Sequence, residues 1–133
     1  MRVSSSSLAS ALASRLNHVM PEAFRLTPED GKLHLHIRGK WSSTSYTLHV
    51  VVDDDTRDSA ERIETAVSSV LSTVQDEVAE NLREPWPSRD GHQMALPGVR
   101  LDADALHMWF GDTEESAVLT LPSIAMHVLN RES

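Results

Sequence analysis

The amino-acid sequence predicts an α+β fold in which two helices pack on one face of an antiparallel sheet. Two stretches with helical apolar spacing are each followed by short stretches in which apolar and polar residues alternate, as they do in strands. The order of these patterns predicts the arrangement α-β-β-β-α-β-β-β. The 133 residues, of which 40% are hydrophobic, correspond to one globular domain spanning residues 1–133.

The first predicted helix lies near the start of the chain. Its apolar residues recur at spacings of four, four and three, which places them on one helical face. They are Leu8, Leu12, Leu16 and Val19. The serines at positions 4–7 supply oxygen atoms for an N-cap, and Pro21 ends the segment.

The strongest helical pattern lies between Asp58 and Pro85. Its apolar residues form a continuous stripe along one face. They are Ile63, Val67, Val70, Leu71, Val74, Val78 and Leu82. Asp58 and Glu61 have the spacing of a capping box, and carboxylates are favoured at a helix N-terminus by the helix dipole. The pattern predicts a helix of about 25 residues that ends before Pro85.

Three strand patterns follow each helix. Those after the first helix are residues 23–27, 32–38 and 45–52. Those after the second helix are residues 98–102, 105–110 and 117–121. We expect Trp41 in a hairpin loop over residues 39–45. Pro122 limits the last strand to a sheet edge or ends it, and the segment after it fits a strand and a short helix equally.

The two halves of the chain share a short similarity. Phe24–Leu26 resembles Val99–Leu101, Leu33–Ile37 resembles Leu106–Phe110, and Thr47–Val50 resembles Val118–Leu121. An internal repeat of residues 4–55 and 58–129 would explain it, and so would independent convergence on the same hairpin pattern. The order of elements is similar to that of the secretion-chaperone-like fold, α-β3-α-β2-α, although no sequence motif accompanies the resemblance.

Charge and composition exclude several classes of protein. The net charge of −8, with 20 acidic against 12 basic residues and no basic run, is unsuited to binding nucleic acid or anionic lipid. A negative net charge of this size favours solubility, or attraction to a basic partner. Without cysteine, disulfides and thiolate catalysis are ruled out. No apolar run approaches the roughly 20 residues of a membrane span, and Arg15 interrupts any signal-peptide pattern, so we expect a cytoplasmic protein.

Histidines occupy alternate positions of the predicted strands. His34, His36 and His49 belong to the first hairpin, and His107 has the matching position in the second half. In a symmetric hairpin His34 would lie opposite His49, and such a set of imidazoles is one that zinc and copper accept as ligands. The alternative is a solvated sheet face, and no carboxylate within these strands would orient the imidazoles. We therefore expect no metal and no other cofactor.

Other patterns that could support catalysis are weaker. The three carboxylates at positions 53–55 lack the spacing of a calcium loop and precede a helix, where negative charge is favoured anyway. The serines form no nucleophile elbow, and the five glycines form no phosphate-binding loop. The sequence therefore predicts no catalytic residue.

Trp109 is expected on the same open sheet face as the histidines. The alternating residues Leu106, Met108 and Phe110 should face the helices. Trp109 and His107 would then face away, and an aromatic side chain on an open sheet face is typical of a contact surface. The predicted partner-binding residues are Trp109, His107, His34, His36 and His49. Trp86, which lies between two prolines, is expected to cover an end of the core.

These observations favour a non-enzymatic acidic protein-binding module that holds a polypeptide partner through its open sheet face and forms a homodimer. Chaperone, adaptor and immunity-type roles fit equally. The alternative is a small metal-binding protein or metal-dependent enzyme that uses the histidine cluster of the first hairpin. An enzyme needs a concave pocket with convergent polar groups, whereas a binding module presents an exposed patch.

Overall fold

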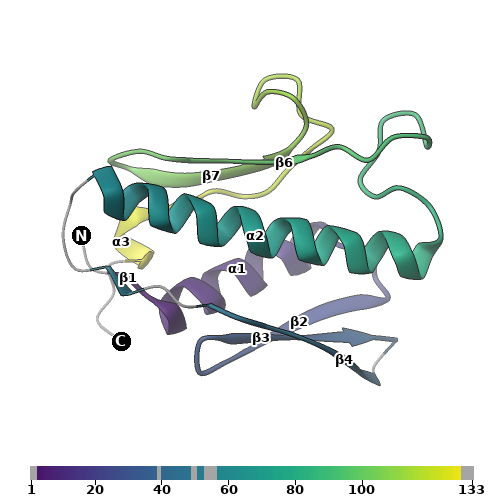
Figure 1. Ribbon diagram of the computed structural model, residues 1–133, viewed down its shortest axis with the longest axis horizontal. Coiled ribbons are helices and arrows are strands. Elements are labelled where there is room, and N and C mark those ends of the chain that lie inside the picture. Colours follow the sequence, from purple (N-terminus) through teal and green to yellow (C-terminus); the bar gives the residue numbers. More distant parts are fainter. Residues whose placement is uncertain (1–2, 39, 49–50, 53–56, 130–133) are drawn as a thin grey trace.

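A computed structural model describes residues 3–38, 40–48, 51–52 and 57–129 and confirms the α+β class. Three helices and nine short strands are found in the described residues (Figure 1). In chain order they are β1 (Val3–Ser4), α1 (Ser5–Val19), β2 (Phe24–Glu29), β3 (Lys32–Ile37), β4 (Lys40–Thr47), β5 (Val51–Val52), α2 (Arg57–Leu82), β6 (Pro97–Leu101), β7 (Ala105–Phe110), β8 (Leu119–Thr120), β9 (Ile124–Ala125) and α3 (Met126–Leu129).

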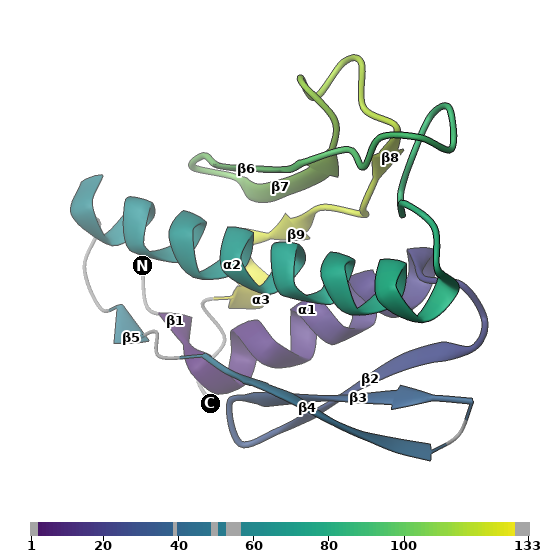
Figure 2. The same ribbon diagram turned by 45° about the vertical axis from the view of Figure 1, so that its right-hand side comes forward.

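The helices form a central layer between two antiparallel sheets. Strands β2, β3 and β4 make one of them, β6, β7, β8 and β9 make the other, and β1 and β5 form a separate two-stranded sheet. Helix α1 packs against β2 and β3, and α2 packs along β6, so the two sheets lie on opposite sides of the helices (Figures 1 and 2). The packing therefore differs from the expected single sheet with both helices on one face. Each sheet still has one inner, apolar face and one outer face.

Helix α1 begins and ends as its sequence predicts. The Ser4 hydroxyl accepts a hydrogen bond from the Ser7 backbone N–H, and the Ser7 side chain returns to the Ser4 backbone N–H, which completes a capping box made of serines. The last turn closes where the Met20 N–H donates to the Leu16 carbonyl, directly before Pro21. Its buried residues include all three leucines of the predicted face.

Helix α2 buries the predicted stripe but does not use the predicted cap. Its start at Arg57 precedes Asp58, so Asp58 and Glu61 both lie inside the helix, and Glu61 forms an ion pair with Arg57 at 3.3 Å. The helix ends at Leu82, where Arg83 adopts a positive φ of 59° that turns the chain. From Ile63 to Val78 the stripe is buried, so the predicted apolar face is confirmed.

The first sheet contains a strand where the sequence predicts a loop. Strands β2 and β3 are joined by Asp30 and Gly31, both at positive φ, as in the tight hairpins that an Asp-Gly pair favours. Strand β4 then begins at Lys40, and Trp41 pairs with His36 of β3. The expected loop over residues 39–45 is therefore wrong, because the chain turns within about two residues at Arg38, whose φ is +54°.

The predicted strand 45–52 is divided between two sheets. Strand β4 ends at Thr47, and the separate strand β5 pairs antiparallel with β1, opposite Val3 and Ser4. The start of the chain and the segment before α2 therefore lie side by side. This pairing places β5 beside the residues that lead into the N-terminus of α1.

The second sheet is a meander around β7. Strand β6 pairs with one edge of β7, while β8 and β9 follow one another along its other edge, separated by residues 121–123. The register shifts by one residue across this gap, which contains Pro122, a residue that cannot donate to a strand ladder. The segment after Pro122, for which the sequence left strand and helix open, contains both: the strand β9 is followed by the single helical turn α3.

The core fills the space between the helices and both sheets. Phe110, Leu106 and Met108 of β7 are buried, as expected for its inner face. Trp86 packs against Phe110 with ring centroids 5.8 Å apart, and so covers the end of the core beneath the linker that follows α2. Each half of the chain thus forms a helix followed by a meander, while a duplication origin stays a prediction.

Candidate partner-binding surfaces

The outer face of β6 and β7 carries Trp109 and His107 side by side, as the alternation of β7 predicts. Across the register Trp109 lies opposite Gly98, and His107 lies opposite Arg100. Both residues of β7 are partly exposed, while their neighbours Leu106 and Met108 are buried. The outer face is therefore amphipathic, with an aromatic ring at one end and charged groups at the other.

The Trp109 indole lies flat on Gly98. A Cβ atom added to Gly98 would stand 2.3, 2.4 and 2.6 Å from three atoms of the ring, so only a glycine fits beneath it. The indole N–H is buried and has no acceptor within the described part of the chain. The ring is thus held in place by its own sheet, with part of its surface left accessible.

An ion-pair network borders the indole. One oxygen of Asp102 accepts hydrogen bonds from the Arg100 guanidinium and from His107 Nε2, each at 2.9 Å. Glu114 accepts from Arg100 Nε and Nη2 at 3.2 and 3.1 Å, and its other oxygen lies 3.8 Å from His107 Nδ1. Two carboxylates from opposite sides therefore fix the orientation of both Arg100 and His107.

The second oxygen of Asp102 closes the hairpin between β6 and β7. It accepts backbone hydrogen bonds from Asp104 and Ala105, both at 2.8 Å. These two N–H groups hold the pKa of the Asp102 carboxyl well below its ordinary value. The side chains of His107 and Arg100 lower that pKa further. One side chain thus links the turn to the charged end of the outer face.

The remaining predicted residues do not join this surface. His34 and His36 lie on the outer face of β3, and this sheet is on the far side of the helix layer from Trp109 (Figure 2). His49 lies outside the described residues. The expected single patch of Trp109 and histidines is therefore divided between two faces, because β3 and β7 belong to different sheets.

The proposed pairing of His34 with His49 is also wrong. His34 lies opposite Ser45 on β4 and opposite Thr27 on β2, and β4 ends at Thr47, before position 49. A carboxylate does approach His34, since Glu29 Oε2 lies 3.7 Å from its Nε2. Over the described ranges, no group of three or more His, Asp or Glu side chains could hold a metal ion. The carboxylates at 53–55 lie outside the described residues.

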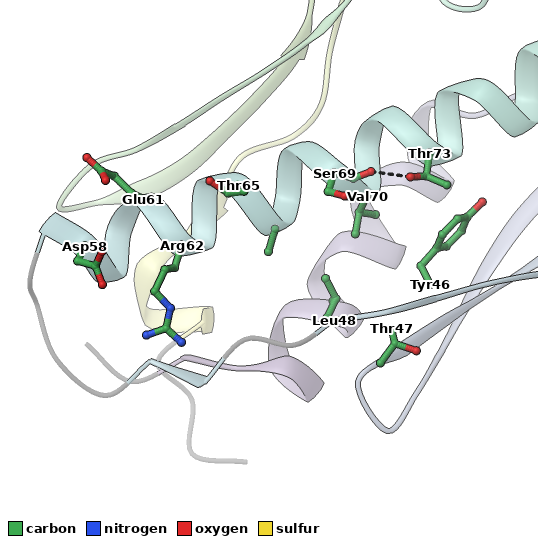
Figure 3. A pocket seen from close by; sticks show the side chains of 11 residues that line it. Tyr46, Thr47, Leu48, Asp58, Glu61, Arg62, Thr65, Ser69, Val70 and Thr73 are labelled. Carbon is green, nitrogen blue, oxygen red and sulfur yellow. Dashed lines mark hydrogen bonds between the residues drawn. The ribbon is translucent and has the colours of Figure 1, made fainter.

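A groove of about 660 Å³ runs between α2 and the edge of the first sheet (Figure 3). Leu48 and Val70 are buried along it, and the exposed side chains of Thr65, Ser69 and Thr73 form one rim on α2. From Thr65 to Gln75 helix α2 has no charged residue. The middle of this groove is therefore uncharged and lined by small side chains.

Tyr46 stands at the Thr73 end of the groove. Its side chain is only 8% exposed, and its hydroxyl is buried without a hydrogen-bond partner among the described residues (Figure 3). Burial raises the pKa of the Tyr46 hydroxyl, and the nearby carboxylates of Glu77 and Asp76 raise it further. The hydroxyl is therefore neutral, and it is a donor for which the described chain supplies no acceptor.

Sequence reasoning missed both the ion-pair network and the groove. The Asp-Ala-Asp stretch at 102–104 is a turn pattern that could have placed Asp102 at a hairpin. Nothing in the sequence brings Glu114 to Arg100, because they meet only through the fold of the loop after β7. In the sequence Tyr46 has the pattern of an ordinary strand residue. That its hydroxyl lacks a hydrogen-bond partner among the described residues depends on the folded structure.

Comparison with known proteins finds no match to a protein-family model, to a curated protein or to a solved structure. Among the described residues, no helix combines the length and the apolar character needed to cross a bilayer.

Proposed function

We propose that this chain is a non-enzymatic protein-binding module that acts through the outer face of β6 and β7. The observation that carries the proposal is the Trp109 indole resting on Gly98 beside the network of Arg100, His107 and two carboxylates. Tryptophan and arginine are the residues that most often dominate binding energy at protein interfaces.

The geometry also supports binding because the surface is held in one conformation before a partner arrives. The ring is supported by Gly98, and Arg100 is held by Asp102 and Glu114. Side chains that are already ordered lose less conformational entropy on association, which would otherwise reduce the affinity. A flat aromatic centre with a polar border has the anatomy of a protein–protein contact.

The partner is a polypeptide, and the first one to consider is a second copy of this chain. A two-fold pair would cover the Trp109 face of each copy with the same face of the other. Light scattering at increasing protein concentration should show a dimer, and Trp109→Asp should shift the equilibrium to monomer.

Leu96→Asp is the matched control. Among the described residues Leu96 is an exposed large apolar side chain, at 69%, and it lines a pocket with Asp90 and Asp112 whose lining does not include Trp109. If Leu96→Asp dissociates the dimer and Trp109→Asp does not, the contact lies elsewhere. If light scattering shows a monomer at every concentration tested, the proposal of a homodimer through the Trp109 face is wrong.

A further inference from the structure

We propose that the groove between α2 and the free edge of β4 binds an extended segment of a partner polypeptide, with small uncharged side chains in its middle and a lysine or arginine at the end nearest Tyr46. This is a separate surface from the Trp109 face, on the other side of α2. The inference therefore holds whether or not the chain self-associates through Trp109.

The first support is the free edge of β4. Among the described strands, β4 pairs with β3 alone, so its other edge is open. The Leu48 N–H donates to the Gly31 carbonyl at 3.0 Å, on the β3 side. Because hydrogen-bonding direction alternates along an antiparallel strand, the N–H and C=O of Thr47 point away from β3, and Thr47 lines the groove. An extended segment could pair with these groups as an added strand.

The second support is the hydroxyl of Tyr46. A buried donor without an acceptor is unfavourable, and native proteins leave few such groups. In the free protein the described residues offer this hydroxyl no acceptor. A segment lying along the groove brings a carbonyl oxygen with every residue. The position of Tyr46, on the strand and at one end of the groove, suits an acceptor from such a segment (Figure 3).

The third support is the distribution of charge. Asp76 and Glu77, on the turn of α2 after Thr73, lie near enough to Tyr46 for their carboxylates to raise its pKa. At the other end of the groove, Asp58 and Glu61 are accompanied by Arg62, so both signs are present. The groove is thus uncharged in the middle, and two carboxylates lie just beyond its Tyr46 end. That pattern selects a basic residue at one end of the bound segment, followed by residues small enough to lie against Thr65 and Ser69.

A phage-displayed library of random dodecapeptides, selected against the full-length chain, tests the proposal. We expect enriched peptides to combine one lysine or arginine with a proline-free run of Ala, Ser, Thr and Val, because proline cannot donate to an added strand. Enriched peptides made synthetically and labelled with fluorescein should bind in anisotropy titrations. Alternate backbone N–H groups of the peptide point to opposite edges, so only one of the two alternating sets can bond to β4. N-methylation of that set should weaken the binding of the peptide by about tenfold or more, and N-methylation of the other set should not.

Two variants locate the binding. Ser69→Arg places a long charged side chain on the rim and should weaken the selected peptides by about tenfold or more, whereas Ser14→Arg, an exposed serine of α1 outside the groove, should not. Tyr46→Phe removes one oxygen that has no partner in the free protein. It should leave the melting temperature unchanged or raised, and weaken the peptide by about fivefold.

Several results would overturn the proposal. One is a selection without enrichment over the bare support, and another is a set of peptides that bind Ser69→Arg and Ser14→Arg equally. If the chain forms a dimer that Ser69→Arg disrupts, then the groove holds a second copy and not a foreign segment. Trp109→Asp should leave peptide binding unchanged, which separates failure of this inference from failure of the proposed function.

Discussion

The contact between Trp109 and Gly98 gives a sharp quantitative prediction. In Gly98→Ala the new Cβ atom would approach the ring to 2.3 Å, whereas ordinary contact begins near 3.4 Å. The indole must therefore move by about 1 Å or the strands must separate, and overpacking of this kind costs about 1–3 kcal/mol. Gly98 has no positive φ, so alanine brings no backbone strain of its own.

A second effect acts in the opposite direction. Alanine restricts the unfolded chain more than glycine does, which favours the folded state by about 0.4–1 kcal/mol. The net destabilisation expected for Gly98→Ala is therefore about 1–2 kcal/mol, or a fall in melting temperature of about 3–10 °C for a domain of this size. Urea denaturation followed by circular dichroism measures the free energy of unfolding directly.

The decisive measurement is the same substitution without the indole. In a Trp109→Ala background the clash is gone, so Gly98→Ala should be neutral or stabilising, and the sign of its effect should reverse. The double-mutant cycle should then give a coupling energy of about 1 kcal/mol or more. Equal effects in both backgrounds would show that the indole does not rest on Gly98, and would remove the main support for the Trp109 face.

Three further predictions concern α2 and the hairpin of β6 and β7. Val74→Asp should lower the free energy of unfolding by about 3 kcal/mol or more in urea titrations, because Val74 is fully buried. The control Glu80→Lys, on the exposed side of α2, should change it by less than about 0.5 kcal/mol. Glu64→Ala should lower the free energy of unfolding by about 1–2 kcal/mol in the same assay, because the Leu101 N–H donates to Glu64 Oε2 at 2.9 Å and would lose its acceptor. An unchanged urea midpoint would contradict that hydrogen bond. The pKa of Asp102 is lowered in the folded state, so the carboxylate stabilises the fold above its ordinary pKa of 3.8, and this contribution is lost as the pH falls below that value. Between pH 5 and pH 2 the urea midpoint should therefore fall less in Asp102→Ala than in the unaltered chain. Equal falls in the two proteins would refute this.

Patterns that repeat over many residues predicted the helices and the inner faces of the strands. The stripe of α2 recurs from Ile63 to Leu82, and Leu33 and Leu35 of β3 alternate without interruption, so packing follows directly from periodicity. The first part of β4, residues 40–44, was missed because it is a run mainly of Ser and Thr with no apolar alternation, and its turn depends on a positive φ at Arg38, a residue with no preference for turns.

The residues of the candidate surfaces were harder to predict because their roles depend on contacts between distant segments. Glu64 falls outside the apolar stripe, and helical spacing alone predicts that Glu64→Lys would be almost silent. In the structure Glu64 holds the end of β6 through Leu101. Likewise, a single alternating sheet would place His34 beside Trp109, whereas the division into two sheets separates them. Local patterns determine which way a side chain points from its strand, but not which sheet the strand joins.

The meeting of α1 with α3 has a consequence for how the chain folds during synthesis. The Ser7 hydroxyl donates to the Leu129 carbonyl at 3.3 Å, and Leu129 is fully buried. The two residues are 122 positions apart, so this contact closes a long loop, and long loops close late. On the ribosome the surface of α1 next to Leu129 must stay open until α3 has emerged. The core is therefore completed only after α3 has been synthesised, and until then the nascent chain exposes an apolar part of its first helix.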